Sequence, residues 1–284
     1  MRTLTISSLR GGSLDLLNND YFILINFEGE TSTATSLGVA TIPNFDGDVV
    51  NSRQAMPRTA LLELYIKENV EVETAKRQIL QVIKPKQECT FHAAQDGRDI
   101  TLTGIVESVN MPRYQNGIIM QCTFHCSQPF WEDFENVVNT LSDIKNLHYF
   151  SADENDMLYF TEEGMAFGEF DFSRQRTFYN GGDVAVGMTI RITAIAPVTN
   201  PKIYAVDGSF IGVNATMKAR DIIEITTGKG YKTATKNGVN ILNDVIDGST
   251  WLQMETGYNT FNIVTDDENT DNCYFELIYK QRYV

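Results

Sequence analysis

The sequence predicts a mainly β protein with two domains and a single α-helix. In several stretches apolar residues alternate with polar ones at a period of two, which is the pattern of strands with one buried face. One stretch, near residues 70–84, has apolar residues at helical spacing instead. The length of 284 residues is long for one hydrophobic core and comfortable for two.

The first 60 residues show strand and loop patterns. Residues 21–27, YFILINF, form a compact apolar run rich in aromatic and β-branched side chains, which predicts a buried strand. From 29 to 57 the composition changes to Ser, Thr, Asn, Gly and Asp, which predicts a long exposed loop or arm. Loops of this length inside a compact domain are usually functional or disordered. The stretch RTALLELYI, which starts at Arg58, predicts another strand.

One amphipathic helix is predicted near residues 70–84. Asn69 is the candidate N-cap, and Glu71 and Glu73 lie in the first turn, where the helix dipole favours acids. Pro85 marks the end of the helix. Apolar residues recur at helical spacing between these limits: Val72, Ala75, Ile79, Leu80 and Ile83.

Three further strands follow the helix. Residues 89–93 form one, and residues 98–131 read as two strands joined by a turn at 112–117. The last strand stops at Pro129, which cannot donate to a ladder. In that strand one face consists of apolar side chains: Met120, Cys122, Phe124 and Cys126.

The second half predicts an all-β sandwich or barrel. From Tyr179 onward it contains many short strands, with Gly, Asn, Asp or Pro at nearly every break and no convincing helical period.

Two groups of motifs resemble the distal tail proteins of long-tailed bacteriophages. Residues 127–131, SQPFW, resemble the end of that family's N-terminal domain, through Pro129, Phe130 and Trp131. In the second half the order of short phrases is similar to the family's C-terminal, galectin-like sandwich, and it includes the late turn of Gly257 and Asn259. The other matching phrases lie at residues 180–183, 200–203, 226–230, 237–238 and 249–251.

The resemblance covers roughly residues 53–284 and implies a domain plan. Residues 1–131 would be a β-sandwich or split-barrel-like domain, with its helix near 70–84. Independently of the resemblance, the composition of residues 132–165, rich in both acids and apolar residues, predicts an acidic connector that contributes strands to the second domain, with its acids facing outward. Residues 166–284 would be a galectin-like β-sandwich. The larger family members insert an arm into the sandwich that grips receptor-binding proteins, and residues 167–284 leave no room for one.

The resemblance also implies a function. In the family, the N-terminal domains form a homohexameric ring that continues the tail tube and leaves a central channel, through which DNA passes without specific binding. The implied partners are the tail tube protein, the tail-tip or tail-associated lysin protein and, in some members, receptor-binding or baseplate proteins. The implied location is the tail tip of the virion, after synthesis in the host bacterial cytoplasm. We expect the 29–57 segment to reach the neighbouring copy, because it is too long for a mere connection.

The charge distribution separates the connector from the domains. The net charge is −14, of which residues 132–165 hold −8, with nine acids and one lysine. Residues 1–131 and 166–284 hold −3 each, and neither has the basic stripe of a nucleic-acid binder. The sequence has no run of roughly 18 consecutive apolar residues, so it predicts no membrane-spanning helix. We expect neutralisation of Glu132, Asp133, Glu135 and Asp143 to leave folding intact and to change the salt dependence of tail assembly.

No catalytic, cofactor or metal site is predicted. Cys122, His125 and Cys126 look like metal ligands, but on a strand His125 points away from the two cysteines. The acids of residues 265–272 lack the spacing and glycine of a calcium loop. The acidic pairs 153–154 and 162–163 give little support to a glycosidase, and residues 226–232 lack the P-loop pattern.

One alternative function stays open, a carbohydrate-binding module or adhesin built on the second domain. Sugar sites usually stack an aromatic ring on the pyranose, and Trp251 is the single tryptophan of that domain. Since Trp251 fits a core as well as a platform, we expect little sugar affinity.

Overall fold

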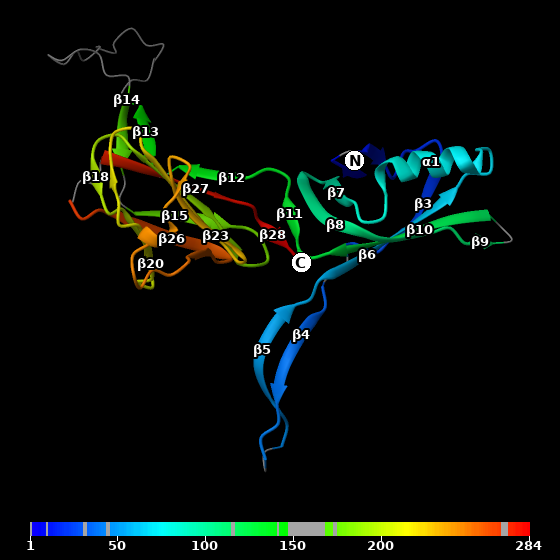
Figure 1. Cartoon of the computed structure of the whole chain (residues 1–284), viewed down its shortest axis with the longest axis horizontal. Coiled ribbons are helices and arrows are strands. Elements are labelled where there is room, and N and C mark those ends of the chain that lie inside the picture. Colours follow the sequence, from blue (N-terminus) through cyan, green and yellow to red (C-terminus); the bar gives the residue numbers. More distant parts are fainter. Residues whose placement is uncertain are drawn as a thin grey trace, which may run out of the picture. The chain divides into compact units, whose positions relative to one another are not determined.

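The computed structural model describes residues 2–9, 11–30, 33–43, 46–114, 117–140, 142–146, 168–172, 175–267 and 272–284. The chain divides into two compact units (Figure 1). Unit 1 comprises Met1–Glu135 and Arg282–Val284, and unit 2 comprises Asn136–Gln281. The last three residues therefore belong to unit 1, whereas the sequence placed them at the end of the second domain.

Unit 1 is built on a ten-stranded sheet of antiparallel pairs. The main path runs β2-β1-β7-β8-β10-β6-β3, while β9 pairs with β10 and β11 pairs with both β8 and β28. Its strands are β1 (Thr3–Ser8), β2 (Gly12–Asp15), β3 (Phe22–Phe27), β6 (Arg58–Ile66), β7 (Glu88–Gln95), β8 (Arg98–Asn110), β9 (Arg113–Tyr114), β10 (Gly117–Cys126), β11 (Trp131–Asp133) and β28 (Arg282–Tyr283).

The helix expected near 70–84 is α1 (Val72–Val82), which packs beside β1 and β2 (Figure 1). Its buried residues are Ala75, Ile79 and Val82. The N-cap is Glu71, so the expectation of Asn69 is wrong. Asn69 instead lies in a turn in which the Val70 amide donates to the carbonyl of Lys67 at 3.2 Å, and this turn delays the start of the helix.

The described residues of unit 2 form two larger sheets, ordered β12-β27-β17-β22-β23-β24 and β15-β26-β19-β20, and three two-stranded ladders, β13-β14, β16-β25 and β18-β21. Its strands are β12 (Val137–Thr140), β13 (Ser142–Asn146), β14 (Gly168–Phe172), β15 (Gln175–Asn180), β16 (Val186–Gly187), β17 (Thr189–Ala194), β18 (Val198–Thr199), β19 (Lys202–Ala205), β20 (Phe210–Gly212), β21 (Thr216–Met217), β22 (Ile222–Gly228), β23 (Tyr231–Lys236), β24 (Val239–Asn240), β25 (Gln253–Met254), β26 (Gly257–Val264) and β27 (Cys273–Tyr279). A 3-10 helix, η1 (Leu242–Asp244), precedes β25.

Both larger sheets of unit 2 contribute to one hydrophobic core. Ile192, Ile225 and Phe275 come from the six-stranded sheet, and Phe178 and Phe261 come from the four-stranded one. Alternate residues of β17 and β22 are buried, as the period of two requires. The predicted fold class, mainly β with one helix, is confirmed.

The stretch 29–57, expected as a loop or arm, contains a β-hairpin formed by β4 (Thr35–Ala40) and β5 (Val49–Ala55). The two strands pair from Thr35 opposite Ala55 to Ala40 opposite Val49. The hairpin was not evident in the sequence because the polar residues of 29–57 mask two short segments that contain β-branched valines.

Candidate functional site

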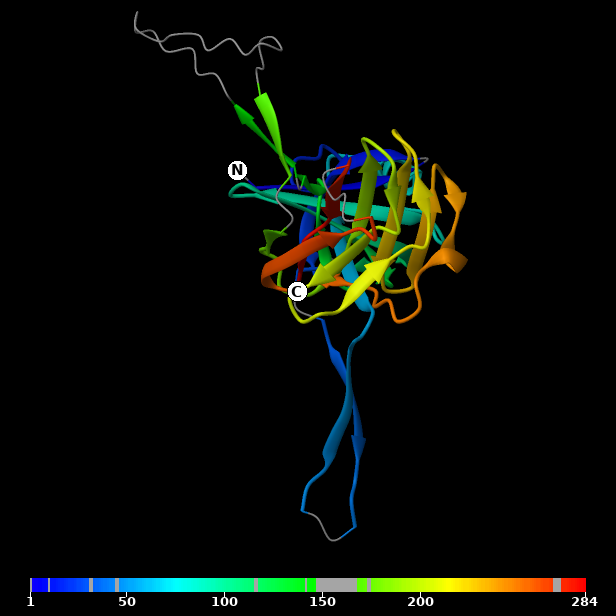
Figure 2. The ribbon, with the colours of Figure 1, turned by 90° about the vertical axis from the view of Figure 1, so that its left-hand side faces the viewer.

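The hairpin, meaning β4 and β5, is an exposed element of unit 1 with an apolar surface. Among the described strands β4 and β5 pair only with each other, and they run away from the unit 1 sheet (Figures 1 and 2). Leu37 and Val39 are each 54% exposed. Four more apolar side chains on or beside the hairpin are also exposed: Ile42, Val49, Val50 and Met56.

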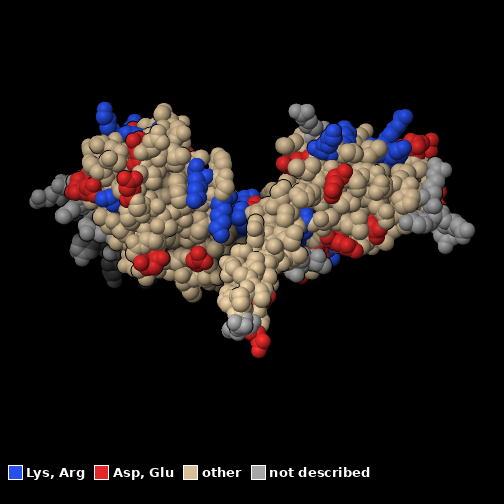
Figure 3. All heavy atoms as spheres, turned by 60° about the horizontal axis from the view of Figure 1, so that its bottom comes forward, with Lys and Arg blue, Asp and Glu red and all other residues tan. Residues whose placement is uncertain are grey.

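The surface of the hairpin carries little charge. Arg53 is the one charged residue in the sequence of its two strands, and most of its visible surface lacks charged groups in Figure 3. A single two-stranded hairpin is marginally stable in water. An apolar, uncharged ribbon of this kind is therefore suited to packing against another protein surface.

The base of the hairpin is held by the carbonyl oxygen of Gly29. This oxygen accepts hydrogen bonds from Nη1 of Arg58 at 2.5 Å and from Nε1 of Trp131 at 2.9 Å. Both donors are almost fully buried, and burial lowers the pKa of the Arg58 guanidinium. We call these three residues the Gly29 anchor. It fixes the chain on both sides of the hairpin to the core of unit 1.

The anchor gives Trp131 of the SQPFW motif a structural position. Its ring meets Phe27 edge-on, with centroids 6.5 Å apart, and Phe27 lies 4.8 Å from Phe91. Pro129 is buried and Phe130 is half-buried, between the end of β10 and β11. The motif thus joins β11, β3 and the start of the hairpin.

The first two acids of the connector have hydrogen-bond partners in unit 1. Glu132 accepts a hydrogen bond from Nε of Arg282 at 2.8 Å, and Asp133 accepts one from the Tyr283 hydroxyl at 2.9 Å. These contacts join β11 to β28, so Glu132 and Asp133 are partly exposed acids with partners inside unit 1. Residues 147–167, which hold most of the other acids, lie outside the described residues.

Gly257 and Asn259 form a turn at the start of β26. Gly257 has φ +86°, a conformation that side-chain-bearing residues rarely adopt. Oδ1 of Asn259 accepts from the Glu255 amide at 2.8 Å, and Nδ2 donates to the Glu255 carbonyl at 2.7 Å. Gly257 and Asn259 therefore close a turn in unit 2, whereas Pro129, Phe130 and Trp131 belong to unit 1.

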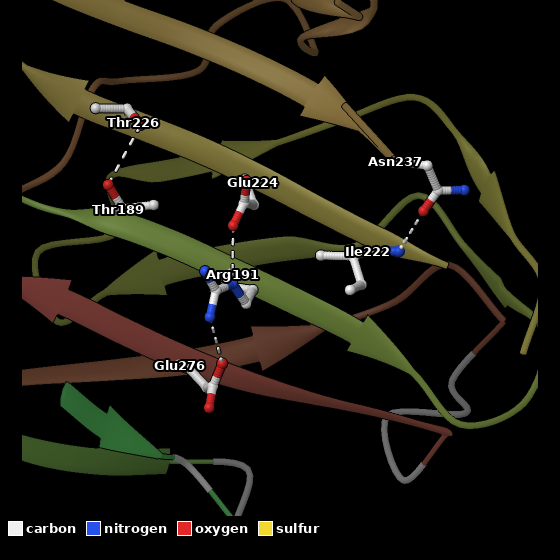
Figure 4. Close-up of polar contacts among 7 residues, drawn as sticks. All are labelled: Thr189, Arg191, Ile222, Glu224, Thr226, Asn237 and Glu276. Atoms are coloured by element: carbon white, nitrogen blue, oxygen red, sulfur yellow. Dashed lines mark hydrogen bonds and ion pairs between the residues drawn. The ribbon is translucent and has the colours of Figure 1, made fainter. Parts of the chain in front are cut away.

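A second candidate site is a polar hollow on the open face of the six-stranded sheet (Figure 4). Its volume is about 390 Å³. At its centre Arg191 donates from Nε to Oε1 of Glu224 at 2.8 Å and from Nη1 to Oε2 of Glu276 at 3.4 Å. The hydrogen bond that Arg191 donates to Glu224 is the main cause of the raised pKa of Arg191. The residues that line the polar hollow are Arg191, Thr193, Ile222, Glu224, Thr235, Asn237, Gly238, Tyr274 and Glu276.

The cysteines and His125 lie as their strand positions predict. Cys122 and Cys126 are buried, and His125, between them on β10, is exposed. Cys89 and Cys273 are buried as well. Burial raises the pKa of Cys122 to about 12, and those of Cys89 and Cys126 to about 11. His125 and the two cysteines of β10 therefore do not converge on one point.

Residues 181–283 match the family model described as the siphovirus-type tail component, C-terminal domain. Over these residues the chain is similar to the C-terminal domain of that family. The predicted resemblance to phage distal tail proteins is confirmed. A search of the curated proteins finds no match.

Solved phage structures are similar to the whole chain. The Dit protein of phage SPP1, described as a paradigm of hub adsorption apparatus in phages that infect Gram-positive bacteria, is 14% identical, with a TM-score of 0.68 over 99% of each chain. A chain of the phage P2 baseplate in its activated conformation with Ca is 13% identical, with a TM-score of 0.49 over 100% of each chain. The SPP1 likeness shows that the fold of unit 1 is shared as well.

Sequence reasoning identified the motif residues but not the contacts that form the Gly29 anchor and the polar hollow. The Gly29 anchor joins positions 29, 58 and 131, and no local pattern links them. The polar hollow combines residues from β17, β22, β23 and β27. Its one sequence signal is the opposite charge of Arg191 and Glu224, which can be paired only once the strand order is known.

Proposed function

We propose that this chain is a distal tail hub, assembled as a homohexameric ring of unit 1 copies. The ring would join the tail tube protein to the tail-tip or tail-associated lysin protein and leave a channel for DNA, which passes without specific binding. The family of the C-terminal domain and the fold likeness to the SPP1 hub protein support this role. The role is structural and requires no catalysis or cofactor.

The observation that carries the ring proposal is the exposed apolar surface of unit 1. A closed ring needs a heterologous interface, in which two different patches of the same protein meet. The hairpin is one such patch. The other is the exposed side of β3, an edge strand on which Ile23 and Ile25 are about half exposed. The two patches could pair between neighbours, with one hairpin covering the next copy.

The energetic gain is large enough to matter. Full burial of a Val, Leu or Ile side chain contributes roughly 1.5–3 kcal/mol. The hairpin side chains are about half exposed, so each would add roughly 1 kcal/mol on assembly. Six such groups per copy, each counted in one interface, give several kcal/mol per interface before the entropy of association is subtracted.

A deletion variant tests the role of the hairpin. The variant lacks residues 36–54 and has an Asn-Gly turn between Thr35 and Ala55, so it keeps the Gly29 anchor. Thr35 and Ala55 are direct cross-strand partners, which a two-residue turn can join. Light scattering and negative-stain microscopy of the full chain should show a ring, and the deletion variant should be monomeric.

Two further variants separate the surface of the hairpin from its length. Leu37→Thr with Val39→Thr and Val50→Thr keeps a β-favouring hairpin but removes its apolar surface, and it should also be monomeric. The matched control is Val206→Thr with Val239→Thr, which removes exposed apolar side chains from unit 2 and should leave the ring intact. Rings of the triple-threonine variant would refute the role of the hairpin. A native chain that stays monomeric even with the tail tube protein present would refute the ring.

A further inference from the structure

The polar hollow on unit 2 has the construction of a small ligand site. It lies on the open side of the sheet, where the alternation of each strand places the residues opposite to the core. Three neighbouring strands supply its centre in register, because Arg191 is the direct partner of both Glu224 and Glu276. Its volume of about 390 Å³ falls in the lower part of the range of about 300–1,000 Å³ for ligand pockets.

The guanidinium at the centre is held in a fixed orientation. Glu224 contacts Nε and Glu276 contacts Nη1, so the planar group is fixed from two sides (Figure 4). Among the described residues, no hydrogen bond engages Nη2, which has two N–H groups to donate. The two carboxylates keep acceptor positions beside it. Donors and acceptors therefore alternate across the floor of the hollow.

The charge of the hollow limits the class of ligand. One arginine and two glutamates sum to −1, which disfavours phosphate, sulfate and other anions. The guanidinium between the carboxylates disfavours a divalent cation. The ligand that fits is neutral and both donates and accepts hydrogen bonds over a short distance. Adjacent hydroxyl groups on a sugar ring do this, since one can accept from the arginine while its neighbour donates to a glutamate.

The walls complete such a site. Thr193 and Thr235 add hydroxyl groups, while the Tyr274 ring and Ile222 add apolar surface for the C–H face of a ring. The rim is pre-formed by Asn237, whose Oδ1 accepts from the Ile222 amide at 2.8 Å (Figure 4) and whose Nδ2 donates to Asp221 at 2.9 Å. Asn237 and Gly238, both with positive φ, form the two-residue turn between β23 and β24.

Stability alone does not explain why Arg191 lies between Glu224 and Glu276. Exposed ion pairs contribute about 0–1 kcal/mol to stability, so the sheet does not require an arginine between two glutamates. We infer that the polar hollow binds a neutral saccharide through adjacent hydroxyl groups, with Arg191 as the central donor and Glu224 and Glu276 as acceptors. This goes beyond the hub role and does not depend on ring formation. Because the hollow lacks a tryptophan platform, binding is weak, in the millimolar range.

Saturation-transfer NMR on the full chain tests the inference. The probes are glucose, galactose, mannose, rhamnose and N-acetylglucosamine, with glucuronic acid as the anionic comparison. We expect transfer to at least one neutral sugar and weaker transfer to glucuronic acid. Arg191→Met and Arg191→Lys should both weaken binding about tenfold, since lysine keeps the charge but loses the planar fork.

The matched control is Tyr258→Ala. Tyr258 is an 81% exposed aromatic residue on the four-stranded sheet, beside Tyr179 at a centroid distance of 5.0 Å, and it offers a competing place for a sugar. Its replacement should leave binding unchanged. Loss of binding in Tyr258→Ala would place the sugar on the other sheet and overturn the assignment. No transfer to any neutral sugar, or unaltered binding in Arg191→Met or Arg191→Lys, would overturn it as well. Protection of Cys273 from alkylation confirms that each variant is folded.

Discussion

Replacement of Trp131 by phenylalanine tests whether the SQPFW motif acts through the Gly29 anchor. Phenylalanine keeps an aromatic ring in the core but removes the indole N–H that donates to Gly29 at 2.9 Å. Arg58 still donates to the same carbonyl, so the oxygen keeps a partner. The change therefore removes one buried hydrogen bond and part of one buried ring, without leaving Gly29 unsatisfied.

The expected loss of stability follows from these two terms. A net intramolecular hydrogen bond contributes about 0.5–1.5 kcal/mol. Trp131 is 2% exposed, and the smaller ring removes buried apolar area equivalent to roughly one or two methylene groups, at about 0.8 kcal/mol each. We expect the free energy of unfolding of unit 1 to fall by about 2 kcal/mol.

The buried cysteines allow the two units to be measured separately. Cys89, Cys122 and Cys126 report on unit 1 and Cys273 on unit 2, so pulsed alkylation in urea with mass spectrometry gives a transition for each. Trp131→Phe should shift only the first transition to lower urea. The control, Trp251→Phe, should leave the first transition in place. An unchanged first transition in Trp131→Phe would refute the anchor as a stabilising element.

Three other predictions concern thiols, acid stability and the connector. In native protein at pH 8, Cys89, Cys122 and Cys126 should resist iodoacetamide in a timed mass-spectrometric assay. At this pH a thiol with a pKa of about 11 or higher is at most about one part in a thousand thiolate. Rapid labelling would contradict their burial. Asp221→Asn should destabilise unit 2 at pH 7 but much less near pH 2. Hydrogen bonds from the Lys218 amide, Asn237 and Lys236 hold the pKa of Asp221 far below 3.8, so the stability that Asp221 contributes is present above pH 3.8 and is lost as the pH falls below it. Urea titrations at both pH values measure this, and an equal loss of stability at pH 7 and pH 2 would contradict it. Glu132→Gln with Asp133→Asn should lower the urea midpoint of unit 1, because both acids contact β28. Glu135→Gln with Asp143→Asn should leave folding unchanged and alter only the salt dependence of tail assembly. The reverse pattern would contradict the β11–β28 contacts.

Local patterns in the sequence predicted the elements of this fold well. The period of two in residues 98–126 became β8 and β10, and the helical spacing after residue 70 became α1. Errors arose where one local preference competed with another. Asn69 is a good N-cap residue, but the turn that contains it prevents that role. The hairpin was obscured because its valines lie among polar residues that favour loops.

The functional features required long-range contacts that a single sequence does not contain. Trp131 was identified from a motif, yet its contact lies 102 residues away, at Gly29. Arg191 and Glu276 are 85 residues apart and were not linked by the sequence pattern. Strand order brings such pairs together, and strand order depends on the packing of the whole core. The acids of 132–165 were treated as one group because composition does not reveal that Arg282 and Tyr283 pair with the first two.

In the ring that we propose, the order of the hairpin and the assembly of the ring are one linked equilibrium. The hairpin has its own cross-strand hydrogen bonds but buries few apolar side chains, and an isolated hairpin is only marginally stable. A neighbour that packs on Leu37 and Val39 binds the ordered hairpin and not the disordered one, so it stabilises that conformation in proportion to its affinity. The Gly29 anchor lowers the entropic cost of this step, because it fixes the chain at Gly29 before the hairpin and at Arg58 after it. Weakening of the anchor should therefore reduce ring formation even though Trp131 is buried inside unit 1.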